Sequence, residues 1–198
     1  MGSTPNRRRS HQHQHHHQHH RSQPRRSSEQ QTSSCKRRIG SAFKKSQTTK
    51  TGLDCSTILS LINCFPNFLG CFAQDTLDTS FMRPPCTFIV NIDSYNQKGS
   101  HWLAIGLFEL TLEVFDPLGF SMFLWESVPC NLLRFLHRYG QKRKILISKR
   151  VQPLTSHNCA FYSLYYILNR DRLSFEKIQN KFHRTGTNER VLNKYFFF

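Results

Sequence analysis

The chain has 198 residues, of which 28 are Lys or Arg and 12 are Asp or Glu, and its formal net charge is +16. This length suits one domain with its own core plus a tail. No apolar run approaches ~20 residues, so we expect no transmembrane helix. Seven irregularly spaced cysteines and a polar N-terminus argue against a secreted disulfide framework and a signal peptide, and favour the cytosol or nucleus.

The first 50 residues are dominated by Ser, Gln, His, Arg and Lys, with twelve basic residues and one acidic residue. A segment with so few apolar side chains cannot bury enough surface to offset the conformational entropy that it would lose on folding. We therefore expect residues 1–50 to be a disordered basic tail. The tail favours a polyanionic partner such as DNA, with a solvated tail that binds nothing specific as the alternative. Its candidate DNA contacts are Arg7, Arg8, Arg9, Arg25, Arg26, Lys36, Arg37 and Arg38. The His-rich tract over 11–20 suits a transition metal chemically, but we expect no biological metal there.

Residues 51–198 carry the patterns of one folded domain. In chain order, the apolar spacing and the breakers predict a helix over 53–61, strands over 86–91, 102–108 and 110–115, a helix over 129–140, a strand over 144–148, and helices over 159–169 and 175–182. The helix over 159–169 is apolar on most sides, which predicts a central, buried position. The result is an α+β domain.

Four side chains provide the chemistry of a cysteine peptidase. Cys159 begins the buried helix, where the helix dipole favours a nucleophilic thiolate. His101 is the candidate base, Asp116 is the carboxylate that would orient it, and the Gln152 amide is a candidate oxyanion donor. We expect Trp102 to pack beside the imidazole and limit the access of water.

The order of these residues makes their convergence plausible. His101 begins one predicted strand and Asp116 ends the next, so a hairpin brings both to the same edge of the sheet. Taken singly, each residue has an ordinary structural role: a buried small hydrophobe, a structural histidine, a turn or a surface amide. His157, two residues before Cys159, is a rival base, but no carboxylate is in an obvious position to orient it. The other cysteines are interpreted as buried or free thiols.

The motifs around these residues resemble the adenovirus-type cysteine endopeptidases (adenain) and, more distantly, the Ulp1-like SUMO proteases. The matching stretches are Asn67-Phe-Leu-Gly, Phe88-Ile-Val-Asn, Gly99-Ser-His-Trp-Leu-Ala, Val114-Phe-Asp-Pro-Leu-Gly-Phe and the step from Gln152 to Cys159. The chain departs from the family in having Ala160 where Gly usually follows the nucleophile. It also has Asp116 where the adenovirus enzymes have Glu, and Gln141 where they have the cysteine that bonds a peptide activator.

The resemblance implies a papain-like α+β fold, with a central mixed sheet flanked by helices. It also implies limited proteolysis of viral precursor proteins near Gly-Gly-like sequences, in the host nucleus and the virion. The chemistry requires no cofactor, while DNA and a short peptide are implied activators. We expect a monomer that acts on protein substrates and binds no membrane. The alternatives are a SUMO- or ubiquitin-like isopeptidase and a catalytically idle DNA-binding protein on the same scaffold.

Overall fold

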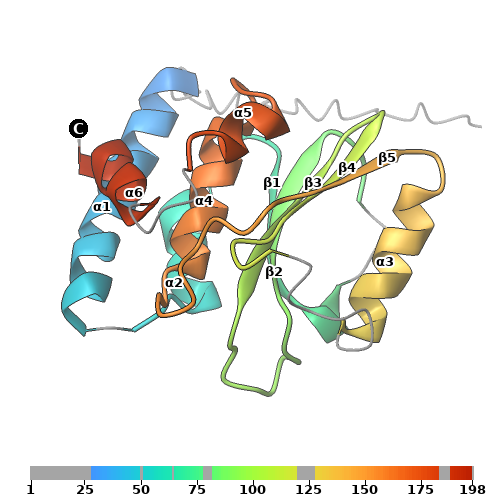
Figure 1. Ribbon diagram of the computed structural model, residues 1–198, viewed down its shortest axis with the longest axis horizontal. Helices are drawn as coiled ribbons and strands as arrows, with labels where there is room; N and C mark the ends of the chain where they lie inside the picture. The colour runs from blue at the N-terminus through green and yellow to red at the C-terminus, as the bar shows by residue number, and fades with distance from the viewer. Residues whose placement is uncertain are drawn as a thin grey trace, which may run out of the picture.

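The computed structural model describes residues 28–49, 51–63, 65–77, 82–119, 128–182 and 188–197. They form an α+β fold in which helices flank a five-stranded mixed sheet (Figure 1). The strands follow the order β1-β2-β3-β4-β5: β1 (Phe68–Ala73), β2 (Cys86–Asn91), β3 (Trp102–Leu107), β4 (Thr111–Phe115) and β5 (Lys144–Ile147). The two outer pairs, β1 with β2 and β4 with β5, are parallel, and the two inner pairs are antiparallel.

The helices cover both faces of this sheet. The helix α3 (Cys130–Gly140) lies on one face, and α4 (Cys159–Arg170) lies on the other with most of the remaining helices beyond it (Figure 1). Those are α1 (Ser28–Thr49), α2 (Cys55–Ile62), α5 (Phe175–Gln179) and α6 (Asn188–Phe197); a short 3-10 turn, η1 (Gln74–Thr76), follows β1. None of the described helices has the length and apolar character needed to cross a membrane.

Alternating side chains on the strands divide the core in two. On β2, Phe88 and Val90 pack into the cluster on the α3 face, while Ile89 between them packs into the cluster on the α4 face. On β4, Leu112 packs into the cluster on the α3 face and Phe115 packs into the cluster on the α4 face. Because β2 lies inside the sheet with both faces covered, all six of its residues are buried. The α4 face holds the larger cluster, and α4 runs through its centre with only its last residue, Arg170, less than buried.

Most predicted elements are confirmed within a few residues. The strand over 86–91 has the expected bounds as β2, and the buried helix over 159–169 is α4 with one further residue. Besides α1, three elements lie outside every predicted range. They are the edge strand β1, the turn η1 and the helix α6.

The expected disordered tail is wrong for residues 28–49, which form the 22-residue helix α1. Three fully buried side chains, Cys35, Ile39 and Phe43, recur every four residues and line one face of α1. Gly40 lets this helix approach α6 closely, since a Cβ there would lie 2.5 Å from the Phe196 carbonyl oxygen. The folded part therefore includes α1 and does not begin at residue 51. Residues 1–27, with the remainder of the expected tail, lie outside the described residues.

Candidate active site

A tight turn at the end of β4 positions Asp116. The Gly119 amide donates to the Asp116 carbonyl oxygen (3.0 Å), which closes a turn with Pro117 at its second position. Gly119 has φ +81, and a Cβ at this residue would lie 2.9 Å from the backbone nitrogen of Arg150. Glycine therefore permits both the turn and the close approach of the segment after β5. That segment is fastened to the turn by the Val151 and Gln152 amides, which donate to the Pro117 carbonyl oxygen.

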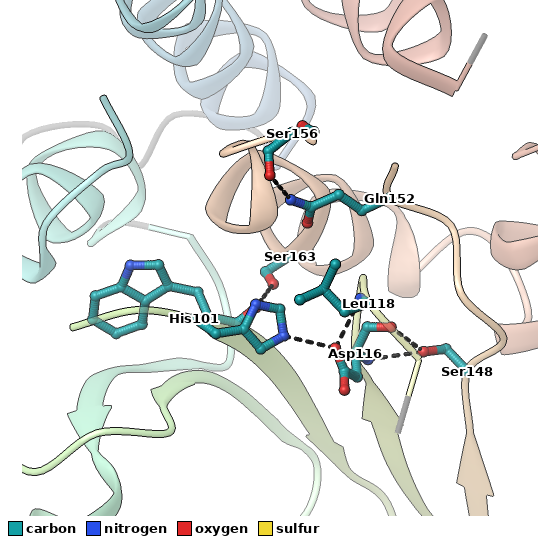
Figure 2. A network of polar contacts seen from close by, with 8 residues as sticks. His101, Asp116, Leu118, Ser148, Gln152, Ser156 and Ser163 are labelled. Carbon is teal, nitrogen blue, oxygen red and sulfur yellow. Dashed lines mark hydrogen bonds and ion pairs between the residues drawn. The ribbon is translucent and has the colours of Figure 1, made fainter. Parts of the chain in front are cut away.

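His101 and Asp116 form a buried ion pair at this edge of the sheet (Figure 2). His101 Nε2 and Asp116 Oδ1 are 2.7 Å apart, with exposed fractions of 4% and 0% for the two residues. The same Oδ1 accepts from the Leu118 amide at 2.9 Å, so the carboxylate is held by the backbone as well. Ser148, just past β5, both donates to the Asp116 carbonyl oxygen and accepts from the Asp116 amide at 2.8 Å. The hairpin of β3 and β4 thus brings the predicted base and carboxylate together.

The pKa of His101 is raised from 6.5 to about 9. Burial by itself lowers the pKa, because it disfavours the imidazolium. Hydrogen bonds to Asp116 and Cys159 and the charges of these two groups outweigh that penalty. The histidine is therefore held as an imidazolium between the carboxylate of Asp116 and the sulfur of Cys159, and an imidazolium can act as a proton donor.

Cys159 is the first residue of α4 and is 7% exposed. Asn158 precedes it at the N-cap, and the side chain of Asn158 makes no capping hydrogen bond to the helix. A helix N-terminus carries partial positive charge, which stabilises a thiolate and an oxyanion beside it. The central helix therefore presents its positive end where the thiol lies.

Gln152 lies between the turn and α4 and is 3% exposed. Its side-chain Nε2 donates to the Ser156 carbonyl oxygen at 2.7 Å (Figure 2). A primary amide nitrogen carries two hydrogens, so one donor remains after this bond. The amide is thus fixed by the loop that leads to Cys159 and keeps a hydrogen available for an oxyanion.

One cleft of about 550 Å³ contains the thiol, the imidazole and the amide. Its walls include His101, Trp102, Leu118, Gln152 and Cys159. Thr51 to Asp54 and Lys98 to Ser100 complete much of its lining. The Trp102 indole donates to the Leu53 carbonyl oxygen at 2.8 Å, so this side chain ties the segment before α2 to the start of β3. The sequence-predicted residues Cys159, His101, Gln152 and Trp102 therefore share one cavity, and Asp116 lies directly behind the imidazole.

His157 also lines the cleft, but the buried carboxylate is paired with His101. The other described cysteines range from buried Cys35 and Cys86 through half-buried Cys55 and Cys71 to exposed Cys130. Within the described ranges, no group of three or more His, Cys, Asp or Glu side chains could hold a metal ion. The His-rich tract and Cys64 lie outside these ranges.

Two of the three candidate DNA contacts on α1 make contacts within the protein. The Lys36 ammonium lies 3.9 Å from the centre of the Tyr195 ring, and Arg38 donates to the Ser60 carbonyl oxygen at 2.8 Å. Arg37 is exposed. The remaining candidates, Arg7, Arg8, Arg9, Arg25 and Arg26, lie outside the described residues.

Sequence reasoning missed the residues that support the site from behind. Ser148 anchors Asp116, and Glu189 accepts from Ser156 Oγ and Asn158 Nδ2 at 2.5 and 2.8 Å. Glu189 lies 30 positions after the nucleophile on a helix that was not predicted, so no local motif marks it. The neighbouring Asn188 donates to the Val151 carbonyl oxygen at 2.7 Å.

Comparisons of the chain with known protein families and with curated proteins give no match.

Proposed function

We propose that the chain is a cysteine endopeptidase. Cys159 is the nucleophile, His101 the acid and base, Asp116 the residue that orients the imidazole, and Gln152 an oxyanion donor. The observation that carries this proposal is the buried His101–Asp116 pair, 2.7 Å between Nε2 and Oδ1, beside a cysteine at the start of the central helix.

In this mechanism, the proton of the Cys159 thiol already resides on the imidazole before the attack, and the thiolate attacks the carbonyl carbon of the substrate. The negative charge that develops on the carbonyl oxygen accepts from the Gln152 amide and from the Cys159 backbone N–H. The imidazolium then protonates the leaving amine, which departs and leaves a thioester on Cys159. Water attacks the thioester while His101 takes its proton, and the product acid and the thiol are released.

The hydrogen bond to Asp116 determines which imidazole nitrogen of His101 transfers the proton. Asp116 accepts from Nε2, so Nδ1 is the nitrogen that exchanges protons with the thiol and the leaving group. The raised pKa of His101, about 9, favours a resting imidazolium at neutral pH, so the proton that the leaving amine needs is in place. Both effects support nucleophilic chemistry over a purely structural histidine.

The substrate proposal rests on the resemblance to the adenovirus-type enzymes, with a papain-like fold of the adenain type. We propose that the substrates are viral or virus-like precursor proteins, cleaved near Gly-Gly-like sequences in a nucleus or a virion. DNA and a short peptide are proposed activators. The net charge of +16 supports an electrostatic contact with DNA.

The test combines three substrates with one labelling experiment. Purified protein is incubated with fluorogenic Gly-Gly peptides, with SUMO conjugates and with a thiol-reactive electrophile, each with and without DNA. We expect peptide hydrolysis and labelling of Cys159, and both should vanish in Cys159→Ala. His101→Ala should abolish hydrolysis, whereas Cys130→Ala, which removes an exposed thiol, should not.

Each alternative has its own outcome. Cleavage of SUMO conjugates without peptide hydrolysis would favour an isopeptidase. DNA binding without any labelling of Cys159 would favour an idle DNA-binding protein. A DNA affinity that is independent of salt concentration would contradict the electrostatic contact.

A further inference from the structure

The N-terminus of α6 holds the loop that carries Gln152 and Cys159. The carboxylate oxygen Oε1 of Glu189 accepts two hydrogen bonds from this loop, from Ser156 Oγ at 2.5 Å and from Asn158 Nδ2 at 2.8 Å. Asn188 donates to the Val151 carbonyl oxygen at 2.7 Å. Two adjacent residues of one helix therefore fasten both ends of residues 151–158.

Each hydrogen bond of Glu189 restrains a residue that contacts or adjoins a proposed catalytic group. Ser156 uses its carbonyl oxygen to accept from the Gln152 amide at 2.7 Å, so the position of Ser156 determines where that amide points. Asn158 is the N-cap of α4 and immediately precedes Cys159. The Asn158 side chain donates through Nδ2 to Glu189 and makes no capping hydrogen bond to the helix, so the amide groups at the start of α4 are not occupied by their own N-cap side chain.

The loop has few other restraints near its middle. Leu154 is 62% exposed, so the loop gains little from burial there. Its local backbone bond joins the Ser156 amide to the Pro153 carbonyl oxygen at 3.0 Å. A charge-assisted acceptor that binds two donors is the stronger restraint.

Glu189 lines a separate hollow of about 320 Å³ and is not among the residues that line the cleft of Cys159. Ser156 and His157 line both cavities, so they form the wall between them. Glu189 is half-buried, and both of its hydrogen bonds use Oε1. A glutamine at this position could therefore place its amide nitrogen where Oε2 now lies. The carboxylate therefore lies outside the lining of the cleft and is joined to it through the loop.

We propose that Glu189 is a positioning residue that orients the Gln152 amide and the Cys159 helix start for catalysis. This proposal rests on the proposed peptidase function. It makes the last described helix a part of the active site, although the helix contributes no group to the cleft.

The test compares Glu189→Ala with Glu189→Gln. The alanine variant loses both hydrogen bonds, and we expect kcat to fall roughly 10- to 100-fold with little change in KM, the range known for residues that orient metal ligands from outside the site. The glutamine variant keeps an amide oxygen that accepts from both donors, so it should retain most of the wild-type kcat. Glu176→Ala is the matched control, because Glu176 is an exposed acidic residue in the first turn of α5. It should behave as wild type.

A second readout keeps this test independent of the substrate. The rate of Cys159 alkylation by iodoacetamide, followed by peptide mass spectrometry, should fall in Glu189→Ala and recover in Glu189→Gln. If wild-type protein hydrolyses no peptide, the proposed function fails while alkylation still measures the positioning effect. If Glu189→Ala unfolds at the assay temperature, Ser156→Ala removes one of the two donors without altering α6. Equal kcat and alkylation rates in Glu189→Ala and Glu176→Ala would overturn the proposal, and so would a glutamine variant as impaired as the alanine variant.

Discussion

The protonation of His101 controls the proposed chemistry. The imidazole is almost completely removed from water, which alone would favour its neutral form. It is charged because Asp116 and Cys159 compensate for the lost hydration. The backbone amide of Leu118 and the hydroxyl of Ser148 fix the position of Asp116, so the compensation does not depend on a mobile carboxylate.

The raised pKa of His101 predicts how stability depends on pH. The folded-state pKa is about 9 against an ordinary 6.5, so the folded state binds the proton more tightly than the unfolded state. The stabilisation is fully present below pH 6.5 and is lost as the pH rises through about 9. Urea denaturation between pH 6 and pH 9.5 should therefore show a falling free energy of unfolding. Asp116→Asn should flatten this dependence, and an unchanged slope in that variant would contradict the ion pair.

The same ion pair predicts the alkaline limit of activity. Above about pH 9 the imidazolium loses the proton that the leaving amine requires. Peptide hydrolysis by the wild type should decline there, and Asp116→Asn should move the decline to lower pH because the neighbouring negative charge is gone. A pH–rate profile of kcat measures both limits. A decline at the same pH in the two proteins would show that another group is responsible.

Gln152 should contribute to the rate and not to substrate binding. Gln152→Ala removes an oxyanion donor, so kcat should fall roughly 10²- to 10³-fold with a smaller effect on KM. Gln152→Glu is the informative companion, since it keeps the size of the side chain and replaces the donor with a repelling carboxylate. Steady-state kinetics of both variants test this role. A wild-type kcat in either variant would show that Gln152 is not an oxyanion donor.

At the level of elements, the turn that follows β4 joins two parts of the site, Asp116 and the segment that carries Gln152. It begins at Asp116, directly after the strand, and its Pro117 carbonyl oxygen accepts from two amides of the segment after β5. Through those bonds the position of Gln152 depends on the same turn as the position of Asp116. A change in the turn should therefore disturb both groups together.

Gly119→Ala tests this dependence. The substitution puts a Cβ at φ +81 and 2.9 Å from the Arg150 nitrogen, so the backbone must shift. We expect a loss of about 1 to 3 kcal/mol in the free energy of unfolding, with a fall in kcat. Gly52→Ala is the stability control, because a Cβ there would meet only an ordinary contact, 3.6 Å from the His157 carbonyl oxygen. Similar stability in the two variants would show that the turn tolerates a side chain.

The sequence predicts the elements whose pattern is local. The strands β2 and β3 and the helix α4 have continuous apolar or β-branched runs, and the Asp-Pro-Leu-Gly turn has breakers at its positions. The edge strand β1 was missed because Gly70 and Pro66 interrupt or precede its short pattern. The contribution of Glu189 was equally hidden, since its partners are more than 30 residues away along the chain.

The helix α1 shows why composition alone misled the prediction for residues 28–49. Its mean composition is polar, but stability depends on where the few apolar side chains lie. Three of them recur every four residues in the larger buried cluster, and Phe43 among them contacts α4 and α6, segments more than 100 residues away. Tertiary packing of one narrow face thus orders a helix that its composition does not favour.

At the scale of the whole molecule, the first and last described helices, α1 and α6, pack against each other in the core. Phe43 on α1 is fully buried, with its ring centre 4.7 Å from that of Phe161 on α4 and 6.3 Å from that of Phe196 on α6. Since α6 also carries Glu189, the packing of α1 supports the helix that holds the loop of the candidate site. A loss of packing at Phe43 should therefore loosen α6 and, through Glu189, the loop of the candidate site.

Phe43→Ala should lower the free energy of unfolding by about 3–5 kcal/mol, because it removes a fully buried ring and leaves a cavity between three helices. Lys45→Ala, an exposed substitution on the same helix, should change stability little. Urea denaturation of both variants measures the difference, and hydrogen exchange of the α6 amides shows whether that helix loosens in the first variant. If α1 were only a solvated tail, the two substitutions would have equally small effects. A destabilised Phe43→Ala whose α6 amides keep their protection would instead confine the role of α1 to the core and separate it from the site.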